Sequence, residues 1–541
     1  MKLTKLVLSN FRSFKDPQTI EFSPVTLLFG ANSVGKTTIL MAIFYLQHIL
    51  DKGQCDPIHI NAMGNRRVDG FKSLVYGGNL NNEITIGIEF EPEQMIGIEY
   101  SAYIEEVSEL LNIQQLLAMK DISSEADCLY VELKIAWSFI SSSAYVKQYN
   151  IFINNEILGT LQAEDSTTSA IISRINFDHP ILIPENNELW EDLSGEKNIS
   201  VSAFQDVLDN LVLSDNSVFM FEGPLRPCEI RYHTDIVIKG CIGALPILGE
   251  KIKTNLKTFD LTEQVHYFNR EIVEKALTQI FTSPLDKICS YLKNSISIGP
   301  IRTIPDSSFI PNPYPEQSGW FDGTSAWDKI YTFDIEELNN NGLINKVSKW
   351  FSSPDKLNSG YEIINSFSIN RTRKKSEINN ISPLPDQNRV LFGKVNSDLR
   401  LFPNQVGVGL TQIMPVVVAS YSVTNGIICI EQPELHIHPA FQVSIGDLFT
   451  QLEMADSKKP MFLIETHSEH IILRILKRIR QSSLGQIPDG MKPVLPNDIS
   501  IINLQSSPEG IIVKKQLITD DGDFLEEWPN GFFDERDEEL F

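Results

Sequence analysis

The chain has 541 residues, of which 42% are hydrophobic and 21% are charged, and its formal net charge is −24. This length predicts two or three structural units, because single hydrophobic cores stop growing beyond about 250–300 residues. The strong negative charge repels nucleic acid, so direct binding to DNA or RNA is uncertain, and any contact must be local or made through a partner. Every apolar run is shorter than the ~20 residues that cross a bilayer, so we expect no membrane association.

The N-terminal stretch MKLTKLVLSNFRSF alternates polar and apolar residues, which predicts a strand and not a secretion signal. A cytoplasmic protein is therefore expected. The six cysteines are far apart and form no CxxC pair, so we expect reduced and mostly buried thiols.

The stretch VTLLFGANSVGKTTILMAIF carries the strongest signal in the chain. An apolar strand leads into the pattern GxxxxGK[ST] and an apolar helix follows, which is the setting in which this pattern binds phosphate. The glycines let main-chain N–H groups point inward around a phosphate, and the helix adds its positive N-terminal end. Lys36 then supplies a cation to the β- and γ-phosphates, and the Thr37 hydroxyl is suited to magnesium. The residues predicted to bind nucleotide here are Gly30, Asn32, Ser33, Val34, Gly35, Lys36, Thr37 and Thr38.

The region after this loop shows strand patterns first and mixed patterns later. EITIGIEFE and CLYVELKIAWSF alternate polar and apolar residues, which predicts an antiparallel sheet attached to the N-terminal half. From about residue 140 to 290, strand-like and helix-like runs alternate without sustained heptads, which argues against a long coiled coil.

Two basic features follow. Arg302, after the Gly-Pro turn of SISIGPIRTIP, is a candidate for a phosphate or partner contact, although a surface arginine fits the pattern equally well. The run INRTRKKSE at residues 369–377 is the densest basic stretch of the chain. It fits a solvated loop, and the alternative is a local contact with nucleic acid or an acidic partner.

A glycine-rich turn and two buried strands come nearer the C-terminus. In FPNQVGVGLTQIMPVVV, Gly409 and Thr411 lie where an apolar helix begins, and such a turn is a second potential anion site. The strand IICIE ends at Glu431, and the strand MFLIE runs into THSEH, which contains His467. Polar residues at the ends of buried parallel strands are where open α/β sheets bind ligands. Lys36 and Glu431 are 395 positions apart, so a large insertion must separate the two halves of one nucleotide domain.

These motifs together resemble those of ABC-type ATPases of the SMC, RecF and OLD group. GPIR at residues 299–302 and EWPNGFFDE at residues 527–535 are similar to segments of Septu-type ATPases of prokaryotic anti-phage defence, including retron-associated versions. The resemblance covers about residues 1–100 and 390–541, besides GPIR. It implies an α/β fold, in which a P-loop ABC-type nucleotide-binding domain is split by a large α+β insertion and the antiparallel sheet is attached to the first half.

The resemblance also sets the expected boundaries. The C-terminal half should carry the signature-like, Walker B and switch-histidine motifs, followed by an acidic-aromatic C-terminal segment. The expected segments are an N-terminal ATPase half with the P-loop (1–135), an inserted α+β and helical region (136–295), a return strand with a helix and the basic loop (296–395), and a C-terminal ATPase half (396–541).

For the bound nucleotide, the resemblance implies that ATP and Mg²⁺ are the cofactors. Lys36 and Thr37 would hold phosphate and metal, and Glu431 would take the Walker B role of orienting the metal together with Thr37. Arg12, in the stretch NFRSF, resembles an N-terminal residue that lies beside the nucleotide.

The same resemblance implies a homodimer or a higher oligomer, closed head to tail around two ATP molecules. Gly409 and Thr411 resemble the signature turn that touches the γ-phosphate of the nucleotide on the opposite subunit, and His467 resembles the switch histidine that senses this phosphate. For a Septu-type ATPase the implied partner is an HNH-type effector nuclease, and retron versions add a reverse transcriptase with a small DNA–RNA hybrid. The chain is thus expected to regulate a separate effector nuclease in antiviral defence.

Gln432 departs from the family pattern, because a second acid follows the Walker B acid in most hydrolytic relatives. An amide positions water but accepts a proton poorly, and loose phosphoryl-transfer transition states depend mainly on positioning and electrostatics. Two interpretations stay open: Glu434 or Gln432 supports slow hydrolysis, or the protein holds ATP for long periods as a clamp. The predicted catalytic residues are Glu431, Gln432, Glu434 and His467.

Two other functions fit part of the sequence. An OLD-type nuclease would cleave nucleic acid itself, but it needs a further metal-binding domain and only 74 residues follow His467. LITDDGD, with clustered aspartates at residues 520–523, is the candidate metal site in that stretch. A RecF-like DNA-repair clamp is disfavoured by the charge of −24, which opposes a direct DNA-binding groove.

Overall fold

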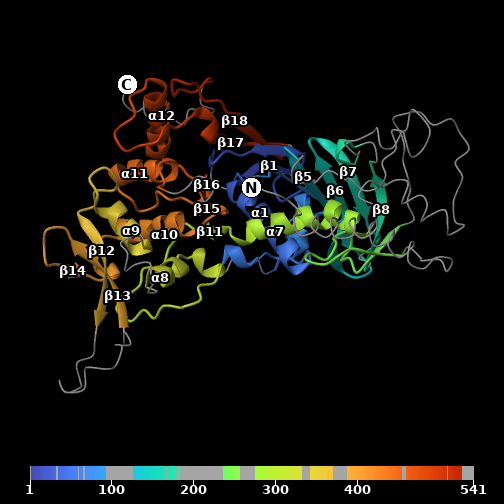
Figure 1. Ribbon diagram of the computed structural model, residues 1–541, viewed down its shortest axis with the longest axis horizontal. Helices are drawn as coiled ribbons and strands as arrows, with labels where there is room; N and C mark the ends of the chain where they lie inside the picture. Colours follow the sequence, from blue (N-terminus) through green and yellow to red (C-terminus); the bar gives the residue numbers. More distant parts are fainter. Residues whose placement is uncertain are drawn as a thin grey trace, which may run out of the picture. The chain divides into compact units, whose positions relative to one another are not determined.

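The computed structural model describes residues 2–31, 34–58, 60–64, 68–92, 126–165, 168–176, 179–182, 236–255, 274–331, 342–368, 387–453, 459–508 and 510–526 (Figure 1). The chain divides into two compact units. Unit 1 contains residues 1–21, 45–59 and 68–293, and unit 2 contains residues 22–44, 60–67 and 294–541. Unit 2 therefore joins a short N-terminal segment to the C-terminal half of the chain.

Some predicted features lie outside the described residues. These are Asn32 and Ser33 of the phosphate loop, the basic run at residues 371–375 and the EWPNGFFDE segment at residues 527–535. Within the described ranges, none of the helices combines the length and the apolar character needed to cross a membrane. The cysteines in these ranges carry free thiols, and all of them except Cys128 are buried.

Unit 2 is built on a six-stranded sheet in the order β11-β15-β16-β3-β17-β18. All neighbouring pairs from β11 to β17 are parallel, and β18 is antiparallel to β17. Every residue of β15 and β16 is buried, which fits the unbroken apolar sequences of parallel strands that are covered on both faces. The strands are β3 (Val25–Gly30), β11 (Ile296–Ile298), β15 (Ile427–Glu431), β16 (Met461–Glu465), β17 (Ile499–Ser507) and β18 (Gly510–Gln516).

Helices supply most of the remaining core of unit 2. Trp327, Phe351 and Met414, from three different helices, are fully buried in one apolar cluster with the strands of the sheet. A small antiparallel sheet in the order β12-β13-β14 adds Phe392 to the same cluster. These elements are α8 (Thr324–Tyr331), α9 (Leu343–Ser352), β12 (Tyr361–Ser368), β13 (Gln387–Lys394), β14 (Arg400–Leu401), α10 (Val408–Ser422), α11 (Pro439–Thr450) and α12 (Glu469–Ser483).

The order of the six strands brings distant parts of the chain together. β3, near the N-terminus, lies between β16 and β17, and β15 lies on the other side of β16. The carboxyl ends of parallel neighbours lie at one edge of a sheet, so Gly30, Glu431 and Glu465 share that edge. The predicted P-loop α/β sheet, assembled from both ends of the sequence, is confirmed.

Unit 1 is built on a nine-stranded antiparallel sheet in the order β10-β9-β8-β7-β6-β5-β4-β1-β2, whose central strands stand out in Figure 1. Asn154 and Asn155 connect β6 to β7 with φ angles of 50° and 68°, as a two-residue hairpin turn requires. The antiparallel sheet predicted after the phosphate loop is thus confirmed. The elements of unit 1 are β1 (Lys2–Ser9), β2 (Gln18–Glu21), β4 (Ile84–Glu91), β5 (Leu129–Ser138), β6 (Ser143–Ile153), β7 (Glu156–Gln162), β8 (Ser169–Ile175), β9 (Val237–Lys239), β10 (Lys253–Thr254) and α7 (Ser283–Lys293).

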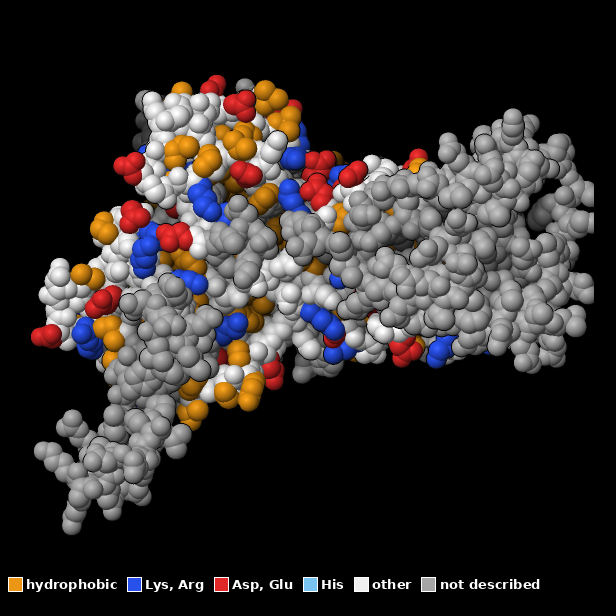
Figure 2. All heavy atoms as spheres, viewed as in Figure 1, with side chains coloured by type: hydrophobic (Ala, Val, Ile, Leu, Met, Phe, Trp, Pro, Cys, Tyr) orange, Lys and Arg blue, Asp and Glu red, His pale blue; other side chains and the backbone are white. Residues whose placement is uncertain are grey.

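The described surface carries charges of both signs. Figure 2 shows acidic and basic side chains in small separate groups on the coloured part of the face in view. On that part of the face neither sign forms one continuous field, and the expectation about nucleic-acid contact stays a prediction.

Candidate functional site

The loop after β3 requires its first glycine for a geometric reason. Gly30 has a φ angle of +142°, and a Cβ atom on it would lie 2.5 Å from the carbonyl oxygen of Leu504 on β17. Only glycine tolerates both this conformation and this close approach. Gly35, with φ of +107°, ends the loop, and helix α1 (Lys36–Lys52) begins at the next residue.

Lys36 is a buried cation that is held by the loop itself. Its side chain is 3% exposed, and Nζ donates hydrogen bonds of 2.9 Å to the carbonyl oxygens of Gly30 and Ala31. Glu465 Oε1 lies 3.9 Å from Nζ. Burial lowers the pKa of Lys36, while Glu465 and Glu434 act in the opposite direction. A buried ammonium whose hydrogen bonds go to main-chain carbonyls is well placed to accept a stronger anionic partner.

The hydroxyl of Thr37 contacts a carboxylate that the sequence interpretation left without a role. Thr37 Oγ1 donates a 3.0 Å hydrogen bond to Glu465 Oε2, at the end of β16. Glu431, the predicted metal-orienting acid, is the direct neighbour of Glu465 across the parallel strands β15 and β16. Both glutamates are buried. One hydroxyl and two carboxylates at one edge are the oxygen donors that Mg²⁺ prefers. The signal for Glu465 was available, because it ends the apolar strand before THSEH.

The loops after β15 and β16 are tied to each other. Gln432 has a φ angle of +46°, and its main-chain N–H donates to the carbonyl of Glu465 at 2.7 Å. Glu434 accepts two hydrogen bonds of 2.7 Å, one from Thr466 Oγ1 and one from the main-chain N–H of His467. Burial raises the pKa of Glu434, although both hydrogen bonds act against this shift. Glu434 therefore holds the THSEH loop in place, in addition to the catalytic role predicted for it.

His467 has an unused polar atom at the site. Its Nε2 is buried and has no hydrogen-bond partner among the described residues. Burial lowers the pKa of His467, and the charge of Lys36 lowers it further, so the ring is neutral at pH 7. An unsatisfied buried nitrogen beside a buried cation fits a site that is completed by a polar ligand.

The glycine-rich turn at the start of α10 exposes other residues to solvent than the predicted Gly409 and Thr411. A Cβ atom on Gly409 would lie 2.9 Å from the carbonyl oxygen of His436, so this glycine packs against the loop after β15. Thr411 is fully buried, and its hydroxyl donates to the carbonyl of Val408 at 2.9 Å. Val408 is 51% exposed and Gly407 is also exposed. The phosphate contact predicted for Gly409 and Thr411 stays a prediction, and the outer surface of the turn is formed by Gly407 and Val408.

Arg302 and Arg12 are the two arginines for which the sequence predicted a contact. Arg302 is only 2% exposed, so the interpretation as a surface arginine is wrong. Its guanidinium donates to main-chain carbonyls of Gln412 at 3.1 Å and Glu431 at 3.0 Å, which occupies the groups that a phosphate would need. Arg12 is exposed in unit 1, where its main-chain N–H donates to the carbonyl of Leu74. Its role beside the nucleotide stays a prediction.

Comparison with known proteins decides the family. A model described as the AAA ATPase domain matches residues 1–472 of the chain. The chain belongs to the AAA ATPase domain family.

This AAA ATPase domain chain is 26% identical over 183 residues to the chromosome partition protein Smc of Halobacteriovorax marinus, a match that covers 32% of the chain and 14% of the relative. It is 50% identical over 46 residues to the DNA replication and repair protein RecF of Natranaerobius thermophilus, covering 8% of the chain and 12% of that relative. The matches therefore span only a small part of each relative's length.

Among solved structures, the AAA ATPase domain chain is similar to an SMC head bound to the C-winged helix domain of ScpA, with 11% identity and a TM-score of 0.38. That match covers 95% of the chain and 97% of the other chain. It is also similar to the SMC head domain from Thermotoga maritima, with 10% identity, a TM-score of 0.35, and coverage of 95% and 99%.

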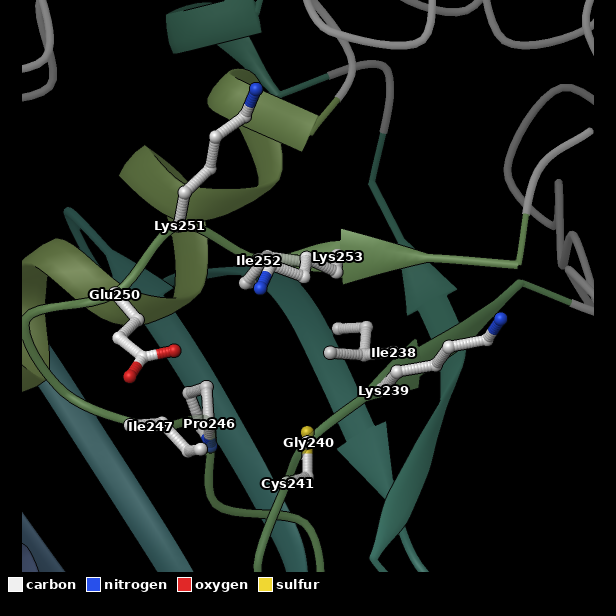
Figure 3. A pocket seen from close by; sticks show the side chains of 10 residues that line it. All are labelled: Ile238, Lys239, Gly240, Cys241, Pro246, Ile247, Glu250, Lys251, Ile252 and Lys253. Atoms are coloured by element: carbon white, nitrogen blue, oxygen red, sulfur yellow. The ribbon is translucent and has the colours of Figure 1, made fainter. Parts of the chain in front are cut away.

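LITDDGD and a small pocket are two further features of the described residues. In LITDDGD, Asp523 pairs with Arg480 at 2.7 Å, and no three His, Cys, Asp or Glu side chains in the described ranges are grouped to hold a metal ion. A small pocket of about 110 Å³ in unit 1 has Ile238, Cys241 and Ile252 among its lining, and the side chains of Lys239 and Lys251 extend away from it (Figure 3). It contains none of the predicted site residues.

Proposed function

We propose that the chain binds ATP with Mg²⁺ at the edge formed by β3, β15 and β16, and that it dimerises around the nucleotide to regulate a separate effector in antiviral defence. The observation that carries the ATP site is the cluster of the buried Lys36 and Glu465 with the half-buried Thr37. Lys36 would exchange its carbonyl partners for the β- and γ-phosphates. Thr37 would hold Mg²⁺ together with Glu431 and Glu465.

Different residues of this chain would have different roles in hydrolysis. Bound Mg²⁺ supplies charge neutralisation on the β- and γ-phosphates. Gln432 would orient water, because an amide positions a nucleophile without removing its proton. Glu434 holds the THSEH loop in place through its hydrogen bond from the main-chain N–H of His467. The Nε2 atom of His467, which has no partner among the described residues, would contact the γ-phosphate.

The second part of the proposal concerns the identity of the effector. Resemblance of GPIR and EWPNGFFDE to Septu-type ATPases supports an HNH-type nuclease as partner, with a reverse transcriptase and its DNA–RNA hybrid in a retron version. The test is to incubate the purified chain with DNA, tRNA and Mg²⁺, with and without the products of adjacent genes. Cleavage only with the adjacent products supports the proposal, and cleavage by the chain alone would instead make it an OLD-like nuclease.

A RecF-like clamp is the second candidate. The local identity of 50% to RecF over 46 residues supports it, whereas the net charge of −24 opposes direct DNA binding. ATP-dependent retention of duplex DNA by the chain alone, measured at about 0.15 M salt because phosphate contacts are salt-sensitive, would favour this candidate. A cytoplasmic location stays a prediction in either case.

The dimer is tested at the exposed turn of α10. Replacing Val408 with arginine places a long cation on a 51% exposed position, where the proposed dimer brings the turn against a second copy. We expect the ATP-dependent doubling of mass to be lost while the unfolding temperature stays unchanged. Light scattering after size exclusion, with and without ATP, measures this. Leu484→Arg, at a 57% exposed leucine beyond α12, is the matched control and should dimerise normally.

The clamp interpretation is tested at Gln432. Gln432→Glu keeps the side-chain length and restores a basic oxygen at the position of the second acid, so phosphate release should become faster, by about 10-fold or more for a general base. The left-handed backbone at this residue costs the same for both side chains. A slower rate would give the amide itself a positive catalytic role, and Gln432→Ala shows how much turnover survives without either group.

A further inference from the structure

Arg302 lies between the two parts of the site that the proposed function assigns to different nucleotides. Its Nη1 donates to the carbonyl of Gln412, in the second turn of α10, at 3.1 Å. Its Nη2 donates to the carbonyls of Glu431 at 3.0 Å and Gln432 at 3.4 Å. One side chain therefore spans from the acidic end of β15 to the start of α10.

The link is reinforced by the side chain of Gln412. Its Oε1 accepts from the main-chain N–H of Arg302 at 3.1 Å, and its Nε2 donates to the main-chain carbonyl of Arg302 at 2.6 Å. Gln412 is almost fully buried. Pro415, one turn further along α10, removes one main-chain hydrogen bond from this part of the helix. The contacts with Arg302 are therefore polar links that hold the first turns of α10, in addition to the apolar packing of this helix in the core.

Stability alone gives a poor reason for this arrangement. The guanidinium is buried, and its Nε has no partner among the described residues. Its Nη1 and Nη2 donate to neutral main-chain carbonyls and not to a carboxylate. Burial of an arginine under these conditions is costly, as the lowering of its pKa to about 10 reflects. The fixed fork of a guanidinium is, however, well suited to hold two backbone segments in one relative position.

We propose that Arg302 is a positioning residue that couples the acidic end of β15 to the Gly407–Val408 turn of α10. A shift of the Glu431 carbonyl on nucleotide binding is passed through the guanidinium to Gln412 and to the turn. This inference rests on the proposed function, in which β15 contacts the nucleotide of its own subunit and the turn meets the nucleotide of a second copy.

The test compares Arg302→Lys with Arg478→Lys in the full chain. Arg478 is a similarly buried arginine of unit 2 that is held by Asp447. The same substitution there therefore measures the effect of replacing a buried guanidinium that is not part of the proposed coupling. Two quantities are measured: the affinity for a fluorescent ATP analogue in dilute protein, and the protein concentration needed for ATP-dependent association. For Arg302→Lys we expect analogue affinity within about threefold of the unaltered chain, but association weakened about 5–150-fold, the usual range of coupling between sites. Arg478→Lys should change neither.

A second variant keeps the inference testable if Arg302→Lys does not fold. Gln412→Ala removes both hydrogen bonds between the Gln412 side chain and the main chain of Arg302 but keeps the bond from Nη1 to the main-chain carbonyl. It should therefore weaken association selectively, but by less than Arg302→Lys. Normal association of either variant, or parallel loss of analogue binding and association, overturns the coupling role alone. Failure of the unaltered chain to associate with ATP overturns the proposed function and the coupling with it.

Discussion

Replacing Lys36 with methionine should abolish ATP binding at micromolar nucleotide. The ammonium is fixed by the Gly30 and Ala31 carbonyls at the point where the phosphates are expected. Hydrogen bonds to charged groups contribute about 1.5–3 kcal/mol each, and the loss of two of them corresponds to a fall in affinity of about 10²–10⁴-fold. Isothermal titration with ATP and Mg²⁺ measures this directly.

The same variant separates loss of binding from loss of fold. Burial lowers the pKa of Lys36, which means that the fold disfavours its charged form. Removing the charge with a side chain of similar length should therefore leave the unfolding temperature unchanged or raise it. ATP should raise the unfolding temperature of the unaltered chain but not that of Lys36→Met. Lys52→Met, at the exposed far end of α1, is the control, and an unchanged ATP affinity in Lys36→Met would contradict the proposed site.

What the sequence predicted well was local. The phosphate loop follows from a glycine pattern between an apolar strand and a helix, and each part of that signal lies within about ten residues. The unbroken apolar runs of β15 and β16 predicted buried parallel strands for the same reason, and both strands are buried throughout. The polar residues that end them do lie at one edge of the sheet, and their role in binding stays a prediction.

The sequence did not predict the contacts that depend on which strands are neighbours in the sheet. Glu465 contacts Thr37 because β16, and not β15, lies directly beside β3. Arg302 is buried because β11 lies beside β15 and α10 packs close by, which no pattern in GPIR itself indicates. Thr411 looked accessible in a glycine-rich turn, but its hydroxyl turns back to Val408. The outcomes for Glu465 and Arg302 are set by tertiary contacts between residues more than 100 positions apart, which periodicity does not reveal, whereas Thr411 is satisfied by a local bond within its own turn.

Glu465 is accordingly the residue whose substitution should change the role of magnesium most. Glu465→Gln keeps the size of the side chain and removes its charge, while a 3.0 Å hydrogen bond from Thr37 remains possible. If Glu465 helps Thr37 and Glu431 to hold Mg²⁺, the magnesium concentration that supports half-maximal ATP binding should rise about 10–100-fold, as for other residues that support metal ligands. ATP binding without magnesium should stay the same or become slightly tighter, because Lys36 remains in place and loses the carboxylate charge that lies 3.9 Å from its Nζ.

The strand register makes this prediction sharper, since Glu431 and Glu465 are direct neighbours on β15 and β16. Two buried carboxylates side by side repel each other, and a divalent cation between them relieves that repulsion. Glu431→Gln and Glu465→Gln should then have similar effects, and the double variant should lose less than the sum of the two. Glu469→Gln, in the first turn of α12, serves as the control. Magnesium dependence lost in Glu431→Gln but normal in Glu465→Gln would leave Glu431 as the sole metal-orienting acid, as the sequence motif alone predicts.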